Sequence, residues 1–137
     1  GEPILTRWQP LWLEQSGSLH PTGAAILPNG DVLLLERSWN EEDGVRARLS
    51  LLPEAEIQAQ ARLTPQPLWR LEDPSLIDNF EAVYVERGAD GATLIYVLSD
   101  DNFSEDQRTL LFQLELRPHG PADPSTASGS EGASGSE

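Results

Sequence analysis

The sequence contains no cysteine, and this absence excludes disulfide bonds, thiolate metal sites and cysteine nucleophiles. Lysine is absent as well, so all nine basic residues are arginine. Long apolar runs are also missing, and none approaches the roughly 20 residues that a membrane-spanning helix needs. The opening residues, GEPILTRWQPLW, have neither the basic start nor the apolar core of a signal peptide. We therefore expect no membrane span, and either a cytosolic protein or a true N-terminus upstream of Gly1.

Positive charge is scarce, because 23 acidic residues stand against nine basic ones and the formal net charge is −14. Nucleic acids and anionic membrane surfaces bind proteins through Lys and Arg, and a field of this sign repels them. We therefore expect no nucleic acid and no anionic membrane among the partners.

Large apolar side chains are absent from the end of the chain, between Pro118 and Glu137. A stretch of Gly, Ser, Pro and acidic residues cannot offset the entropy lost when its backbone becomes ordered. We predict one domain over residues 1–117 and a disordered tail over 118–137.

The first half of the chain carries a hairpin signal. Two apolar runs, 22–27 and 31–37, flank Pro28-Asn29-Gly30, and Asn-Gly between such runs is typical of a β-hairpin. The second run is apolar at each position from Val32 to Leu35, which indicates a strand covered on both faces.

Beyond this hairpin, residues 46–51 resume a period of two and predict a third strand with one exposed face. Between Pro53 and Arg62 the alternation continues, but Glu, Ala and Gln favour helix over strand. We predict a helical turn at 53–57.

The second half predicts three more strands, over 80–86, 93–99 and 108–116. The last of them places four apolar side chains on one face: Leu110, Phe112, Leu114 and Leu116. The order strand, turn, strand, loop, strand thus occurs twice, and it predicts an all-β fold with two antiparallel sheets of three or four strands. Two blades of a larger β-propeller fit this pattern, and so do the two sheets of a sandwich. In a propeller, missing blades or a partner chain would cover the exposed faces.

Two polar clusters stand at the ends of predicted strands, Ile77-Asp78-Asn79-Phe80-Glu81 before one and Ser99-Asp100-Asp101-Asn102-Phe103 after the next. In an antiparallel hairpin the start of one strand lies beside the end of the other, so the clusters would meet there. Carboxylate and amide oxygens suit Ca²⁺, which makes calcium the candidate cofactor. Capping of nearby backbone N–H groups is the alternative. The candidate metal ligands are Asp78, Glu81, Asp101 and Asn102.

Glu81 and Arg37 are the candidate catalytic residues. Glu81 lies among apolar strand neighbours, where a carboxylate must find a partner or face an open cavity. Arg37 follows Glu36 at the end of the apolar strand and suits a phosphate or carboxylate, although a salt bridge to an acidic residue is the alternative. Because adjacent strand residues point to opposite faces, we expect either Glu36 or Arg37 to be structural.

Other nucleophile and base candidates have weak support. His20 precedes a proline in a predicted loop and His119 lies in the predicted tail, so neither has an evident triad partner. No Gly-x-Ser-x-Gly elbow surrounds Ser99. For the tryptophans we expect packing between sheets rather than ligand stacking. They are Trp8, Trp12, Trp39 and Trp69.

Three motifs occur in order along the chain: PTGAAILPNGDVLLLERSW, IDNFEAVYV and LIYVLSDDNFSEDQRTLLFQLEL. From Pro21 to about Leu116 they resemble the C-terminal part of the family called esterase-like activity of phytase. That family usually has glycine after the glutamate of the second motif, where this chain has Ala82. The resemblance implies a β-propeller-like fold, export to the periplasm or out of the cell, and hydrolysis of phosphate or carboxylic esters.

These observations leave three hypotheses. The first is a calcium-dependent hydrolase of small esters or phosphoesters, in which Glu81, Asp101 and Asn102 hold the metal or substrate and Arg37 orients the anion. The second is a non-catalytic periplasmic propeller module that binds a ligand or a protein. The third is a fragment without independent activity.

Overall fold

The computed structural model describes residues 1–4, 7–42, 44–71, 79–100, 103, 105–106 and 108–117. Within them the fold is all-β, as predicted, and no helix is long and apolar enough to cross a membrane. The predicted tail lies outside the described residues. In chain order the elements are β1 (Trp12–Leu13), β2 (His20–Ile26), β3 (Val32–Asn40), β4 (Gly44–Leu52), a 3-10 helix η1 (Glu54–Glu56), β5 (Arg62–Leu63), β6 (Gln66–Leu71), β7 (Phe80–Arg87), β8 (Thr93–Ser99) and β9 (Leu111–Leu116).

The first sheet is antiparallel, with the strand order β2-β3-β4-β6. Its predicted hairpin is confirmed, because β2 and β3 pair on either side of Pro28-Asn29-Gly30. Gly30 has a φ of +93°, and a Cβ at this position would collide with the carboxylate of Glu54. The turn therefore requires glycine. Leu33, Leu34 and Leu35 of β3 are all buried, and because neighbouring strand residues point to opposite faces, the strand is covered on both of them, as predicted.

The prediction that one face of residues 46–51 is exposed was wrong. The strand exists as β4, but its residues from Ala47 to Ser50 are all buried. The polar members of the pattern turn inward because they satisfy one another: Arg48 Nε donates to Glu36 Oε2 at 2.7 Å, and Ser50 Oγ donates to the same oxygen at 2.6 Å. Period-two patterning identified the strand, but could not show that its polar face is also covered.

The edge strand β6 was not predicted. Pro67 lies within it, and proline is tolerated in sheets at edges and bulges. Here both conditions hold, since β6 is the last strand of its sheet and its pairing with β4 shifts register between Leu49 and Ser50. The predicted helical turn at 53–57 is confirmed as η1. The short strands β1 and β5 pair in parallel as a separate two-stranded sheet.

The second sheet is the antiparallel meander β7-β8-β9. It confirms the three predicted strands, although the last begins at Leu111 instead of Arg108. The four apolar residues expected on one face of this strand are all half-buried, while Leu111, Gln113 and Glu115 between them are exposed. The period-two prediction therefore holds along this strand.

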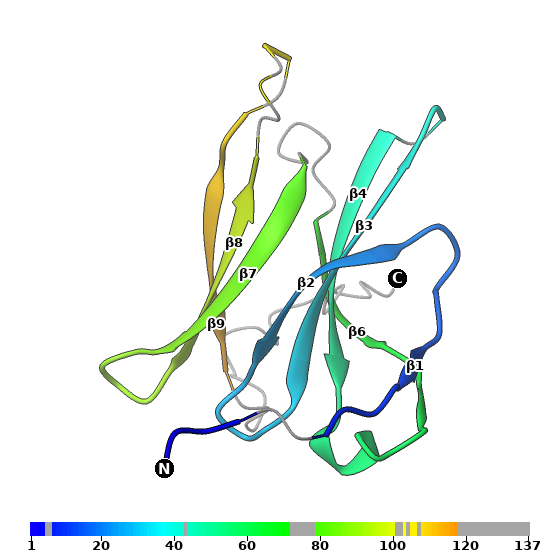
Figure 1. Cartoon of the computed structure of the whole chain (residues 1–137). Helices are drawn as coiled ribbons and strands as arrows, with labels where there is room; N and C mark the ends of the chain where they lie inside the picture. Colours follow the sequence, from blue (N-terminus) through cyan, green and yellow to red (C-terminus); the bar gives the residue numbers. More distant parts are fainter. Residues whose placement is uncertain are drawn as a thin grey trace, which may run out of the picture.

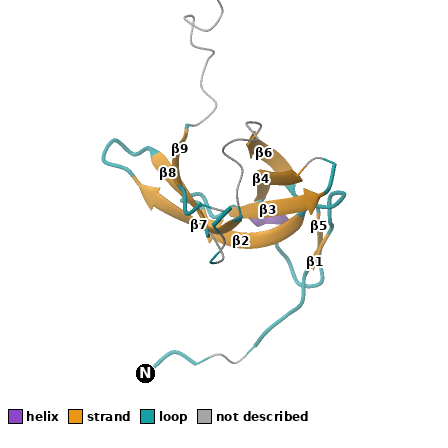
Figure 2. Cartoon of the chain, turned by 90° about the horizontal axis from the view of Figure 1, so that it is seen from above, coloured by secondary structure: helices purple, strands orange, loops and turns teal. Residues whose placement is uncertain are grey.

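The core lies between the two sheets. In Figure 1 the sheets stand side by side, with β2 next to β7, and in the view from above they diverge from these two strands (Figure 2). The Phe80 and Phe112 rings pack with their centroids 5.5 Å apart. The buried apolar side chains of this cluster are Leu27, Leu33, Leu35, Ala47 and Leu49 from the first sheet and its turn, and Phe80, Ile95 and Val97 from the second.

Candidate functional site

A β-bulge places Glu81 at the junction of the two sheets. Phe80 pairs with Ser99, whereas Ala82 pairs with Leu98, so Glu81 is the extra residue on β7. The bulge shifts the alternation, because Phe80 and Val83 both face the core while Ala82 is exposed. Bulges commonly re-aim a side chain beside a functional site. Glu81 is therefore left unpaired on β7, and strict alternation does not decide the direction of its side chain.

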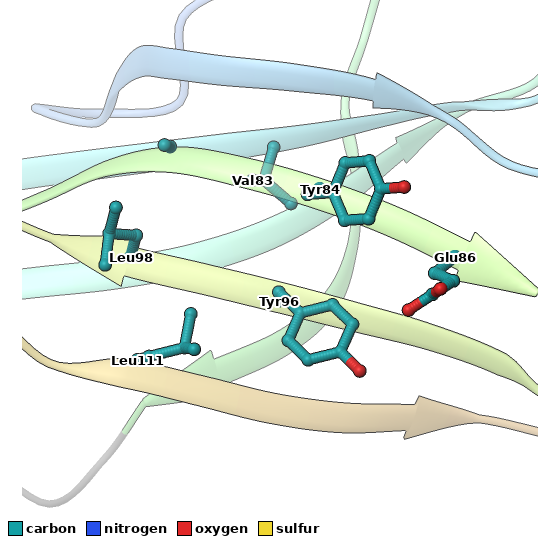
Figure 3. A pocket seen from close by; sticks show the side chains of 7 residues that line it. Val83, Tyr84, Glu86, Tyr96, Leu98 and Leu111 are labelled. Atoms are coloured by element: carbon teal, nitrogen blue, oxygen red, sulfur yellow. The ribbon is translucent and has the colours of Figure 1, made fainter. Parts of the chain in front are cut away.

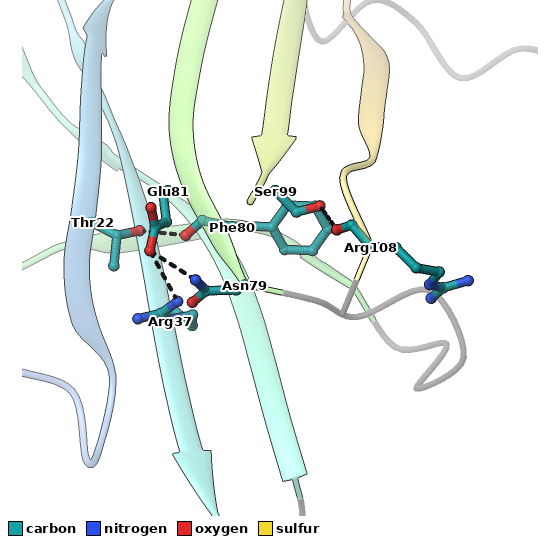
Figure 4. A network of polar contacts seen from close by, with 7 residues as sticks. All are labelled: Thr22, Arg37, Asn79, Phe80, Glu81, Ser99 and Arg108. Atoms are coloured by element: carbon teal, nitrogen blue, oxygen red, sulfur yellow. Dashed lines mark hydrogen bonds and ion pairs between the residues drawn. The ribbon is translucent and has the colours of Figure 1, made fainter. Parts of the chain in front are cut away.

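A second bulge lies opposite, on β2. Pro21 pairs with Glu36 and Gly23 with Leu35, which makes Thr22 the extra residue. Its hydroxyl donates a hydrogen bond of 3.0 Å to the carbonyl oxygen of Phe80, directly before Glu81 (Figure 4). The two bulges thus fix one another across the junction between sheets.

The two strands approach each other at Gly23, where a Cβ would make ordinary van der Waals contacts. A Cβ on this residue would lie 3.4 Å from the backbone nitrogen of Val83 and 3.5 Å from the carbonyl oxygen of Glu81. Alanine at position 82 likewise needs no special backbone, because positive φ among the described non-glycine residues occurs at Gln60 and Phe103. The glycine usual in the related motif is therefore not required here.

The carboxylate of Glu81 has two partners, one from β3 of the first sheet and one from the residue before β7. Asn79 Nδ2 donates to Glu81 Oε1 at 2.7 Å, and Arg37 Nη1 lies 3.8 Å from the same oxygen (Figure 4). Both contacts fall on Oε1, so Oε2 makes no hydrogen bond within the described part of the chain. Of the two expected outcomes for this carboxylate, a partner or an open cavity, the structure shows partners, and the two candidate catalytic residues lie together.

Arg37 carries an unused hydrogen-bond donor. Its side chain is 29% exposed, yet its Nη1 atom is buried and makes no hydrogen bond with the described residues. The 3.8 Å to Glu81 is an ion pair, but it is too long for a hydrogen bond. The exposed part of the side chain can be reached by an incoming oxyanion, with which a guanidinium forms charge-assisted hydrogen bonds. Arg37 is therefore suited to bind an anion.

Beside this ion pair lies a cavity of about 480 Å³ at the end of the first sheet. It is large enough for a small organic molecule, since ligand pockets commonly measure about 300–1,000 Å³. Ser38 also lines the cavity, and its buried hydroxyl has no hydrogen-bond partner in the described residues. The described residues that line the cavity are His20, Thr22, Arg37, Ser38, Trp39, Val45 and Asn79.

Glu36 and Arg37 divide their roles as expected from strand geometry. Glu36 is 1% exposed and bound to Arg48 and Ser50, whereas Arg37 faces the cavity and Glu81. Glu36 is therefore the structural member of the pair. Sequence reasoning could not choose between them, because the choice depends on which face the second sheet covers.

Three of the four candidate metal ligands, Asp78, Asp101 and Asn102, lie outside the described residues. The expected meeting of their clusters is seen in the backbone, where Asp100 N donates to the carbonyl oxygen of Asn79 at 3.0 Å. Within the described ranges no group of three or more His, Cys, Asp or Glu side chains could hold a metal ion. Calcium stays a prediction.

The structure also places Ser99 and His20, the other candidate nucleophile and base. Ser99 is 1% exposed, and its hydroxyl donates to the Arg108 carbonyl at 2.7 Å (Figure 4). The same hydroxyl accepts from Leu110 N at 2.8 Å, so Ser99 has a structural role. His20 lines the cavity instead of lying in a loop, because β2 begins at this residue and pairs it with Arg37. In the sequence, the one signal for this placement was that His20 lies just before the first predicted hairpin strand.

The packing expectation for tryptophan was right for Trp69, which packs against the core, and wrong for the others. Trp8, Trp12 and Trp39 are 82%, 50% and 65% exposed. Among these three, Trp39 lines the cavity. For Trp39 the expectation was wrong because composition does not show where the second sheet ends and the β3–β4 hairpin extends past it.

A second hollow, of about 380 Å³, lies on the outer face of the sheet β7-β8-β9 (Figure 3). Its walls are almost wholly apolar, with Glu86 as the one charged group and no cation among the described lining residues. Such a surface offers packing area but nothing to bind or activate an anionic ester. It is lined by Ala82, Val83, Tyr84, Glu86, Tyr96, Leu98 and Leu111.

The family model described as Phytase-like, esterase-like activity of phytase, matches residues 6–103, well over half of the chain. The match begins before the predicted Pro21 and ends at Phe103, short of Leu116. No curated protein and no solved structure matches the chain significantly. The matched range includes the whole first sheet, both bulges, and Arg37 with Glu81.

Proposed function

We propose that this chain, which belongs to the Phytase-like family, is a hydrolase domain acting on small esters or phosphoesters at the Arg37–Glu81 site. One observation carries the proposal: a carboxylate whose contacts with Asn79 and Arg37 both fall on Oε1 lies beside a partly exposed guanidinium that lines a cavity. This is a general base next to an anion-binding group, which is the minimum that water-dependent ester cleavage needs.

In this proposal Arg37 binds the phosphoryl oxygens of the substrate, or the carbonyl oxygen of a carboxylic ester as it becomes anionic. Glu81 takes a proton from water as the water oxygen attacks phosphorus or carbon. The ester bond breaks, and the leaving oxygen takes up a proton to become an alcohol. Asn79 holds Glu81 Oε1 and so directs Oε2 to the water. Thr22 fixes the bulge that carries Glu81.

Calcium is not assigned a step in this scheme. Around Glu81 the described residues do not fit a calcium site, because Arg37 already balances its charge and Ca²⁺ takes six to eight oxygens. The predicted ligands Asp78, Asp101 and Asn102 keep a separate calcium site as a proposal. Addition of EDTA would test it: a drop in turnover that calcium restores supports the site, and unchanged turnover removes it.

The hydrolase proposal is tested with p-nitrophenyl phosphate and p-nitrophenyl acetate, measured for the wild type, Glu81→Gln and Glu86→Gln. Glu86 lies on the same strand, on its exposed outer face, and serves as the matched control. Because a positioned general base contributes about 100-fold or more, Glu81→Gln should lower kcat by at least that factor. Equal rates for the wild type and Glu81→Gln would contradict the proposal.

A non-catalytic binding module is the second candidate. The observation in its favour is that Arg37 provides a binding group by itself, and Glu81 is as well suited to hold Arg37 in place as to act on water. It predicts that phosphate raises the melting temperature while no ester is turned over. Robust turnover that depends on Glu81 would remove this candidate.

The propeller architecture is also proposed. Two antiparallel sheets that diverge from adjacent strands, β2 and β7, have the relation of neighbouring blades (Figure 2). The outer face of the second sheet, with Tyr84 and Leu111 more than 60% exposed, is where a further blade or a partner chain would pack. Binding of a hydrophobic dye to the wild type, and its loss in Leu111→Asp, tests whether this face is uncovered.

A periplasmic or secreted location follows from the family resemblance alone and is proposed on that ground. Cell fractionation of the producing organism with an antibody against the chain tests it. Recovery in the cytosolic fraction would contradict it.

A further inference from the structure

The face of β3 that packs on the core becomes steadily more exposed along the strand, toward the cavity. Leu33 and Leu35 are fully buried, the Arg37 side chain is 29% exposed, and Trp39 is 65% exposed. These residues alternate along the strand and so share one face. Successive residues on one face are about 6.6–6.8 Å apart, which places the Trp39 ring one step outward from the anion-binding group.

Trp39 forms an apolar wall of the cavity together with Val45. The two residues are directly opposite in the β3–β4 register, and both line the cavity. An exposed indole face is a good stacking surface, and such contacts contribute most with flat apolar groups. Among the described lining residues, the cavity thus has one arginine, Arg37, and the aromatic ring of Trp39 one step outward from it.

The charge of the site limits which anions it can hold. Arg37 is the one arginine among the described residues that line the cavity, and the chain as a whole carries −14. A polyphosphorylated ligand needs several cations and is repelled by a field of this sign. A ligand with one phosphoryl or acyl oxyanion and a flat apolar group fits better, because Arg37 can bind the oxyanion and Trp39 can stack on the apolar group.

We infer that Trp39 is a specificity-determining residue, and that the site selects esters with one anionic group joined to an aromatic or flat apolar group over polyphosphorylated ones. The inference rests on the proposed function and names the substrate class of the same site. The juxtaposition of Trp39 with Arg37 on one strand face supports it.

The test uses phosphonates, which carry a phosphate-like anion and are not hydrolysed. Affinities of phenylphosphonate, methylphosphonate and tripolyphosphate are measured by isothermal titration calorimetry with the full chain. The variants are Trp39→Ala, Trp39→Phe and, as the matched exposed tryptophan outside the cavity, Trp8→Ala. Melting curves check that each variant is folded.

The wild type should bind phenylphosphonate roughly threefold to tenfold more tightly than methylphosphonate, the advantage expected of one aromatic contact. Trp39→Ala should abolish this ratio and leave methylphosphonate affinity unchanged, while Trp39→Phe and Trp8→Ala retain it. Tripolyphosphate should bind no more tightly than methylphosphonate. Equal affinities for the two phosphonates, a ratio unaffected by Trp39→Ala, or tighter binding of tripolyphosphate would overturn the inference.

Failure of this inference differs from failure of the proposed hydrolysis. If the Trp39-dependent ratio is present and no ester is turned over, the site binds this class of ligand without being a hydrolase. If esters are turned over through Glu81 and the ratio is absent, the hydrolase stands and the selectivity of Trp39 is refuted.

Discussion

Two glutamate–arginine pairs meet on β3, where neighbouring residues Glu36 and Arg37 point to opposite faces. The Glu36–Arg48 pair is closed: its atoms are 2.7 Å apart and both side chains are at most 3% exposed. The Arg37–Glu81 pair is open: its atoms are 3.8 Å apart, and its side chains are 29% and 44% exposed. The same two residue types therefore serve a structural role on one face and remain accessible to a ligand on the other.

The energetic contrast between the pairs follows from burial. Removing one member of a buried ion pair leaves an unpaired charge without water, which is strongly destabilising. An exposed pair is weakened by solvent and by the entropy of its side chains, so it contributes little to stability. Mutations of the two pairs should consequently differ in what they damage.

The largest effect on stability is expected for Arg48→Met, which leaves the Glu36 carboxylate buried with Ser50 as its remaining partner. The free energy of unfolding should fall by about 3–5 kcal/mol, measured by urea denaturation. The double variant Glu36→Leu/Arg48→Met removes both charges and should recover most of this loss. A single variant as stable as the wild type would show that the pair is not a closed structural unit.

Arg37→Met should separate binding from stability. Loss of a charge-assisted bond worth about 1.5–3 kcal/mol predicts at least a tenfold weaker affinity for methylphosphonate, measured by calorimetry. The free energy of unfolding should change by less than about 1 kcal/mol. Arg87→Met, an exposed arginine at the far end of β7, is the control and should leave affinity unchanged. Unaltered binding in Arg37→Met would place the anion site elsewhere.

The smallest effect is expected at the link between the bulges. Thr22→Val removes the hydroxyl that bonds the Phe80 carbonyl and should lower the free energy of unfolding by about 1 kcal/mol, the usual net value of one hydrogen bond. Thr22→Ser keeps the hydroxyl and should retain most of the stability in the same denaturation experiment. Identical stability of Thr22→Val and the wild type would mean that the bulges hold without this bond.

Local signals were sufficient to predict most of the fold. Asn29-Gly30 marked the first hairpin, and period-two patterning marked the strands of both meanders. The edge strand β6 was not predicted, because Pro67 argues against a strand unless that strand is known to lie at the edge of a sheet. The burial of Arg48 was not predicted, because a polar residue in an alternating pattern looks the same in the sequence whether it faces water or a buried glutamate.

The site was predicted in part. Glu81 and Arg37 were named individually, and the structure brings them together. Their contact depends on Thr22 and on two register shifts, and the position of a bulge cannot be assigned until the pairing of the strands is known. The cavity position of His20 and Trp39 depends in turn on how far β3 and β4 extend past the second sheet, which is a property of tertiary packing.

The central claim is that the open pair serves function and not stability, and Glu81→Gln tests it most directly when turnover and unfolding are measured on one preparation. The account predicts that kcat for p-nitrophenyl ester hydrolysis falls about 100-fold or more, while the free energy of unfolding changes by less than about 1 kcal/mol. Unchanged turnover, or a loss of stability comparable with that of Arg48→Met, would contradict it.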